Sequence, residues 1–166
     1  MKQESFQKQL LSLTDKLFRL ALSITGNRQD AEDVVQDTLL NVWKKKDNWE
    51  QIDNWEAYCY RSTRNIAIDK ISLTAHRQEA WSDEYDEPDT VFSAQERLEE
   101  EEQLLLLENF LRKLPEKQRT IFQLREVEDL SYKQIADVMS ISEEQVKVNL
   151  FRAMQKIKTF FERFIP

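Results

Sequence analysis

The stretch that decides the fold is residues 130–157, LSYKQIADVMSISEEQVKVNLFRAMQKI. It contains two short segments of helical periodicity with a tight corner between them. Each segment opens with a serine that is followed three residues later by a glutamine, which is the pattern of a capping box. The two pairs are Ser131 with Gln134 and Ser142 with Gln145. The pattern predicts two consecutive helices.

The second segment has two faces of different character. One is apolar at spacings of four, three and four, and is predicted to be buried: Val146, Leu150, Ala153 and Ile157. The opposite face carries side chains that can contact phosphates and base edges: Lys147, Asn149, Arg152 and Lys156. A helix-turn-helix presents its second helix to the major groove in this way, so we expect DNA binding.

An ordinary helical hairpin with solvated charges is the alternative for this stretch. The corner has Ser140 where such turns often use glycine. The second segment opens with Glu143 and Glu144, which phosphates repel. These three residues weaken the DNA-binding interpretation without removing it.

The composition of the whole chain predicts an all-α fold. Among 166 residues there are one glycine and three prolines, too few turn residues for a sheet protein. The chain is 40% hydrophobic and 33% charged, as expected for a globular protein. One cysteine, Cys59, and one histidine cannot build a zinc site or a disulfide framework, so we expect no metal and no cofactor. Neither a membrane span nor a signal peptide is recognised, which predicts a cytoplasmic protein.

The charge is unevenly divided along the chain. Residues 1–78 carry 12 basic and 11 acidic side chains, residues 79–109 carry one and 12, and residues 110–166 carry 11 and eight. The net charge of −7 therefore resides in the middle segment. We expect two small helical domains, 1–78 and 110–166, joined by an acidic linker over 79–109. Such a chain should bind DNA weakly alone, which suggests that it works within a larger assembly.

Apolar spacing predicts three helices in the first domain. The first ends near Gly26, the second covers residues 28–46 after a cap at Asn27, and the third covers residues 55–72. In the third, aromatic side chains alternate with basic ones, an arrangement that suits single-stranded nucleic acid. The alternative is that some of these rings belong to the core, and we expect about half to be buried.

The second domain is predicted to begin with further helices. Residues 79–97 have no apolar period and predict a linker. Helix resumes near Ser93 and ends before Pro115, and one more helix over residues 116–127 leads into the helix-turn-helix.

Three stretches together resemble the sigma-70 superfamily. Residues 27–37, NRQDAEDVVQD, resemble its second-helix signature, and residues 58–69, YCYRSTRNIAID, resemble the following helix. Residues 114–119, LPEKQR, with residues 124–136, LREVEDLSYKQIA, resemble the start of its fourth conserved region. The compact chain, with two such regions and a linker, is similar to the extracytoplasmic-function (ECF) group of bacterial sigma factors.

The resemblance implies three binding surfaces. The first would hold the clamp helices of the polymerase β′ subunit, where a solvated acidic face is the alternative: Asp30, Glu32, Asp33, Gln36 and Asp37. The second would read and open the −10 promoter element as single strands: Trp49, Tyr58, Arg61, Arg64, Asn65 and Asp69. The third would read the −35 element as duplex: Tyr132, Lys133, Lys147, Asn149, Arg152 and Lys156. Asn65 and Asp69 are equally well explained as structural partners within the domain.

Two departures from the family pattern limit which residue roles can be carried over from the family to this chain. Tyr58, Cys59 and Ser62 stand where tryptophan, leucine and isoleucine are common. Val148 and Asn149 replace a frequent serine–arginine pair, and because arginine favours guanine while asparagine favours adenine, the −35 preference cannot be carried over from relatives.

The resemblance implies an alternative sigma factor, a non-enzymatic subunit that binds core RNA polymerase, through β′ and β, and directs initiation at a set of promoters. The resemblance also allows an anti-sigma factor as a further partner. The rivals are a one-component helix-turn-helix regulator and a helical adaptor protein. The regulator needs a sensor or receiver domain, and residues 1–78 show no strand pattern.

Overall fold

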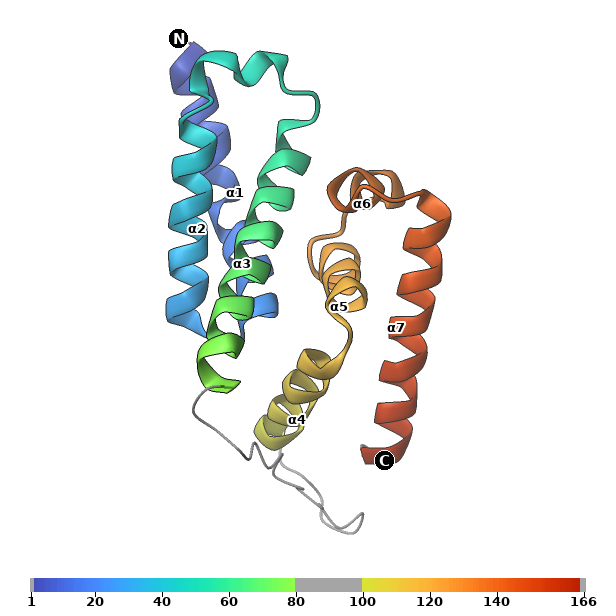
Figure 1. Ribbon diagram of the computed structural model, residues 1–166. Coiled ribbons are helices and arrows are strands. Elements are labelled where there is room, and N and C mark those ends of the chain that lie inside the picture. Colours follow the sequence, from blue (N-terminus) through green and yellow to red (C-terminus); the bar gives the residue numbers. More distant parts are fainter. Residues whose placement is uncertain (1, 80–99, 165–166) are drawn as a thin grey trace.

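The computed structural model describes residues 2–79 and 100–164, and this part of the chain is built from helices without strands (Figure 1). The helices are α1 (Lys2–Thr25), α2 (Arg28–Trp43), the 3₁₀-helix η1 (Lys46–Gln51), α3 (Trp55–Glu79), α4 (Glu100–Lys113), α5 (Glu116–Phe122), the π-helical turn η2 (Gln123–Val127), α6 (Tyr132–Met139) and α7 (Glu143–Phe164). The predicted all-α fold is confirmed. The linker predicted over 79–97 and the helix restart near Ser93 lie outside the described residues, except for the last residue of α3.

The first three helices form an antiparallel bundle, seen at the left of Figure 1. Its core is the apolar stripe of α1, including Leu17 and Leu20, closed by Val34 from α2 and by Cys59 and Ala67 from α3. Leu17, Leu20, Val34, Cys59 and Ala67 have no exposed surface. The packed bundle therefore fixes the helices that carry the predicted polymerase-binding surface, on α2, and most of the predicted −10 surface, on α3.

The junction between α1 and α2 follows the prediction, whereas the end of α2 does not. The side chain of Asn27 caps α2 by accepting a hydrogen bond from the backbone N–H of Asp30 at 3.1 Å. The helix ends at Trp43 rather than at residue 46, and Lys46–Gln51 forms the short 3₁₀-helix η1. The earlier turn lets the ring of Trp49 pack on Phe6, with centroids 5.3 Å apart.

The helix-turn-helix has both predicted capping boxes. Ser131 Oγ accepts from the N–H of Gln134 at 3.1 Å, and Gln134 Oε1 accepts from the N–H of Ser131 at 2.8 Å. Ser142 and Gln145 make the same exchange at 3.1 and 3.2 Å. At the corner Ser140 takes φ 56°, the left-handed conformation that glycine usually supplies, and it does so without preventing the turn.

The helix predicted over residues 116–127 is interrupted. Regular α-helix stops at Phe122, and the chain continues as a π-helical turn to Val127. Asp129 then adopts φ 57°, and the N–H of Leu130 donates to the carbonyl of Leu124 at 2.9 Å. This reversal closes the turn and directs Leu124 and Leu130 into the core, which the apolar spacing alone does not reveal.

The two helical units pack against each other. Helix α6 lies beside α3, and α5 lies beside α1 (Figure 1). One cluster of buried residues runs through both units and includes Tyr60 from α3, Leu124 from η2 and Ile135 from α6. A smaller cluster joins α7 to the end of α4 through Leu114, Ala153 and Ile157.

Candidate nucleic-acid interfaces

The second helix of the helix-turn-helix turns its basic face outward. Lys147, Arg152 and Lys156 are exposed on α7, while the predicted apolar face, from Val146 to Ile157, is buried. Asn149 is half-buried, and its Nδ2 donates to the carbonyl of Gln145 at 2.7 Å. An exposed cationic face on the second helix is the surface that a helix-turn-helix places in the major groove.

Tyr132 sits at the edge of this face between two cations. The guanidinium of Arg125 lies 4.4 Å from its ring centroid and the ammonium of Lys147 lies 5.5 Å from it, both within cation–π range. The contacts hold the half-buried ring and tie α6 to α7. Lys133 is exposed beside it, whereas Lys156 Nζ donates to Gln118 Oε1 at 3.0 Å.

The aromatic candidates of the first domain divide between core and surface. Tyr60 is buried, and burial raises the pKa of its hydroxyl. Trp49 and Tyr58 are half-buried against the core, and the ammonium of Lys45 lies 5.0 Å from the ring of Tyr58. Cys59 is buried, and burial raises the pKa of its thiol to about 12, so it is an inert core thiol.

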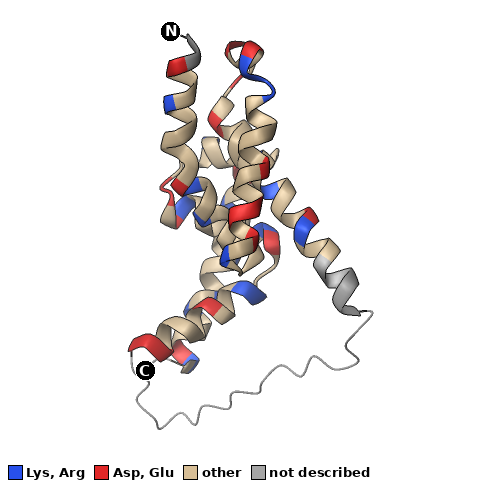
Figure 2. Cartoon of the chain, turned by 90° about the vertical axis from the view of Figure 1, so that its left-hand side faces the viewer, with Lys and Arg blue, Asp and Glu red and all other residues tan. Residues whose placement is uncertain are grey.

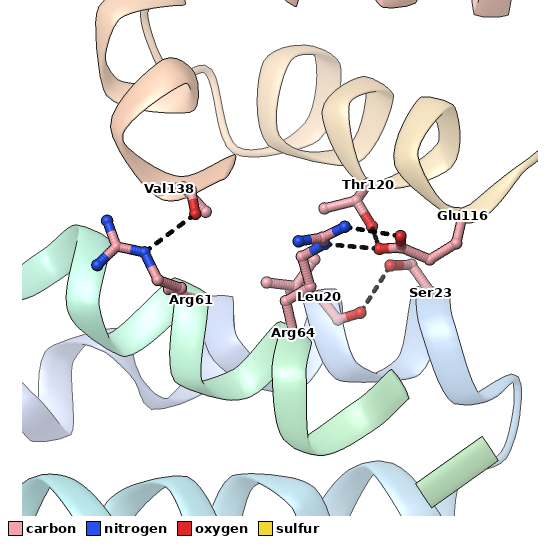
Figure 3. A network of polar contacts seen from close by, with 7 residues as sticks. All are labelled: Leu20, Ser23, Arg61, Arg64, Glu116, Thr120 and Val138. Carbon is pink, nitrogen blue, oxygen red and sulfur yellow. Dashed lines mark hydrogen bonds and ion pairs between the residues drawn. The ribbon is translucent and has the colours of Figure 1, made fainter. Parts of the chain in front are cut away.

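The arginines of α3 are engaged by the second helical unit (Figure 3). Arg64 forms a bidentate pair with Glu116, at 2.8 and 2.9 Å. Arg61 donates to the backbone carbonyls of Asp137 and Val138, the latter at 3.3 Å. Asn65 and Asp69 lie exposed on the same helix.

The acidic row lies on α2, on the side of the molecule that Figure 2 presents. Four of its members are exposed and Asp30 is half-buried. Asp33 pairs with Lys70 at 3.3 Å and Glu32 with Arg28 at 3.4 Å, both in contact with solvent. A partner with basic side chains can reach the row, because exposed pairs of this kind are weak.

Two acids at the contact between the units were not predicted from the sequence. Glu116 was expected only as the start of a helix, and Glu128 was given no role of its own. Both pair with arginines of the first unit, Glu128 with Arg19 at 2.6 and 2.9 Å. Positions 19 and 128 are far apart in the sequence, and the motif at residues 124–136 that contains Glu128 does not indicate a partner at position 19. Burial would raise the pKa of Glu116, but hydrogen bonds from Arg64 and Thr120 outweigh it and lower that pKa.

Comparison with known proteins identifies the family. The family described as Sigma-70 region 2 matches residues 11–81, and Sigma-70, region 4, matches residues 104–157. The ECF RNA polymerase sigma factor SigL of Mycobacterium tuberculosis is 30% identical over 149 residues, which cover 86% of this chain and 80% of SigL. The chain belongs to the ECF sigma factors. This family consists of non-enzymatic transcription initiation factors, and the chain is an alternative sigma factor that directs transcription initiation.

Other similar proteins agree in family and fold. SigE of Mycolicibacterium smegmatis is 27% identical over 151 residues, which are 90% of this chain but only 58% of SigE, so the chain spans little more than half of that relative. The sigma factor RpoE in its complex with the anti-sigma factor NepR, from Bartonella quintana, has the same fold, with a TM-score of 0.75. The two are 23% identical, and the match covers 96% of this chain and 98% of RpoE.

None of the described helices combines the length and the apolar character that crossing a bilayer requires. Across residues 2–79 and 100–164, histidine, cysteine and carboxylate side chains do not gather into a metal-binding group either.

Proposed function

We propose that this sigma factor binds core RNA polymerase through the acidic row on α2 and reads its promoters at two places. In this proposal residues 1–78 bind the β′ clamp helices and the melted −10 strand. Residues 79–109 form the acidic connector, which passes through the polymerase towards its active-site cleft, and residues 110–166 bind the −35 duplex. The β subunit is a further contact of the whole chain. The protein acts in the cytoplasm and has no catalytic activity of its own.

The observation that carries the proposal is the outward-facing basic surface of α7 in a chain with both sigma regions. Lys147 and Arg152 are exposed on the second helix of a helix-turn-helix whose apolar face is buried. Phosphate contacts would position this helix, and one or two base contacts would select the sequence. Asn149 is half-buried beside them, and its amide suits adenine.

The −10 surface is assigned to α3 and the segment before it. Tyr58 offers a half-buried ring with Lys45 beside it, which can stack on an unpaired base while the cation contacts the backbone. Trp49, Arg61, Arg64, Asn65 and Asp69 complete the surface in this proposal. Since Arg61 and Arg64 contact the second helical unit, binding here requires that unit to move away from α3.

The decisive experiment is run-off transcription with purified core polymerase and the full chain. The sigma factor should start RNA synthesis from promoters mapped by sequencing the 5′ ends of transcripts after its overexpression. Core enzyme alone on the same templates is the control. Absence of both core binding and directed initiation would overturn the proposal.

An anti-sigma partner is the second part of the proposal. A similar fold, that of RpoE, is known in complex with the anti-sigma factor NepR, which supports a protein partner of the same kind here. Coexpression of the full chain with candidate regulators and run-off transcription tests this part. A regulator that binds the chain should suppress initiation in proportion to the complex formed.

A further inference from the structure

Three arginines on one side of the first helical unit contact the second unit. Arg19 of α1 pairs with Glu128, Arg64 of α3 pairs with Glu116, and Arg61 lies on α3 between them in sequence, on backbone carbonyls of α6. The two arginine–glutamate contacts are each double hydrogen bonds, at 2.6 to 2.9 Å. Such fork-like pairs are the geometry in which arginine binds either a carboxylate or a phosphate.

The two glutamates are well fixed in the closed chain. The side chain of Glu128 is only 1% exposed, and Glu116 Oε1 also accepts from the hydroxyl of Thr120 at 2.7 Å (Figure 3). Hydrogen bonding to Glu128 raises the pKa of Arg19. Both carboxylates are therefore fixed anions presented to a basic surface, unlike the exposed pair of Arg28 with Glu32 on α2.

We propose that Arg19, Arg61 and Arg64 form one phosphate-binding face for single-stranded promoter DNA, and that Glu116 and Glu128 occupy it in the free chain as substitutes for phosphates. This inference rests on the proposed function and adds Arg19 to the DNA-binding surface. Arg61 is occupied by neutral acceptors instead, the backbone carbonyls of Asp137 and Val138.

The arrangement makes DNA binding and closure of the chain mutually exclusive. A ligand that needs the open state has an apparent affinity reduced by the fraction of chains that are open. Weakening the closed state therefore tightens DNA binding without adding any DNA contact. Core polymerase would do the same if it holds the two units apart, because it would remove the competitor from the arginines.

The first test is the double variant Glu116→Gln/Glu128→Gln. Glutamine keeps the size and one acceptor but removes the charge. We expect roughly tenfold tighter binding of a labelled single-stranded DNA of mixed sequence, measured by fluorescence anisotropy with the full chain. Glu126→Gln/Glu162→Gln is the matched control, because both side chains are exposed and the change in net charge is the same. Equal tightening in both variants would overturn the inference, since it would be an effect of net charge.

The role of Arg19 is tested by one substitution that should have opposite effects on DNA affinity in two backgrounds. In the natural chain Arg19→Gln removes the partner of Glu128, so it should open the chain and tighten binding of single-stranded DNA. In the Glu116→Gln/Glu128→Gln background Arg19 no longer has a carboxylate partner, so its substitution removes no contact of this kind between the units. There the same substitution should weaken binding and reduce the slope of log K against log salt by about 0.7, the value for one phosphate on a single strand. No weakening in that background would remove Arg19 from the phosphate-binding face.

Opening is measured separately by hydrogen–deuterium exchange of the amides in α3 and α6. The double glutamine variant should exchange faster there than the natural chain and its control, with circular dichroism confirming the folded state. Faster exchange without tighter DNA binding would mean that the arginines hold the units together and bind no DNA. Failure of the proposed function is distinct, because then neither the natural chain nor any variant would start transcripts with core polymerase.

Discussion

Helices α3 and α7 both carry basic residues on one face, but only one of these faces is open. Arg61 and Arg64 of α3 are bonded to the second helical unit, whereas Lys147 and Arg152 of α7 are exposed. Both faces contain the residue types that bind nucleic acid. The difference between them shows that the packing of the chain on itself decides which basic face a ligand can reach first.

The largest expected effect comes from breaking the packing that covers the α3 face. Leu124 is completely buried in the core shared by the two units. Leu124→Ala should lower the free energy of unfolding by about 2–5 kcal/mol. Because no tryptophan follows Trp81, tryptophan fluorescence reports on the N-terminal part, and its midpoint should fall together with that of circular dichroism.

The control for this prediction is Leu104→Ala, since Leu104 is 60% exposed on α4. It should leave both midpoints nearly unchanged. A fluorescence midpoint that does not move in Leu124→Ala would mean that the two units unfold independently and that the α3 face is only loosely covered.

The open face of α7 is tested by Arg152→Ala. Binding of a −35 duplex and initiation from promoters that depend on it should fall roughly ten- to hundredfold, the range for one specific bidentate contact. Binding to core polymerase should be unchanged. Lys158→Ala, an exposed cation of the same helix outside the proposed site, provides the comparison. Parallel loss of core binding would contradict the division between the two surfaces.

A smaller effect is expected at the acidic row, which is as accessible as α7 but of opposite charge. Asp33→Lys/Asp37→Lys should slow association with core polymerase about tenfold at low ionic strength, and less at high salt. Surface plasmon resonance at two salt concentrations measures this. Asp15→Lys/Glu4→Lys changes the same charge at exposed positions of α1. Unaltered association in the α2 variant would make the row a solvated face.

The smallest effect is a pH dependence of the covered face. Because the pKa of Glu116 is lowered in the closed chain, its pair with Arg64 contributes fully above the ordinary glutamate pKa and is lost as the pH falls through the lowered value. At neutral pH the melting temperature of the natural chain should therefore be higher than that of Glu116→Gln, and this difference should vanish on acidification. Thermal melts of both proteins across the acid range test the sign. A difference that grows toward low pH would contradict it.

Much of the local structure was predictable because short-range chemistry produces it. Asn27 caps α2, and the serine–glutamine pairs cap α6 and α7, since each cap needs only neighbours three residues apart. The buried face of α7 followed from a single spacing rule. By contrast, the early end of α2 at Trp43 and the π-helical turn after Phe122 depend on distant rings and leucines that the spacing does not locate.

The candidate surfaces divide in the same way. Their residue types could be read directly: acids on α2, aromatic and basic residues on α3, and cations on α7. The sequence could not say that Trp49 packs on Phe6, nor that Lys156 is engaged with Gln118. Those outcomes depend on side chains that meet only when helices from different parts of the chain pack together.

The amino-acid sequence by itself determined the helices, the helix-turn-helix and the family, because periodicity, caps and motifs act over a few residues. Only the tertiary structure decided which charged side chains are paired within the chain and which remain accessible to a ligand. Arg19 and Glu128 are 109 positions apart, and their bidentate pair exists because α1 and the turn after η2 bury a common core. A charge pair of this kind forms through packing between distant segments, which no local pattern encodes.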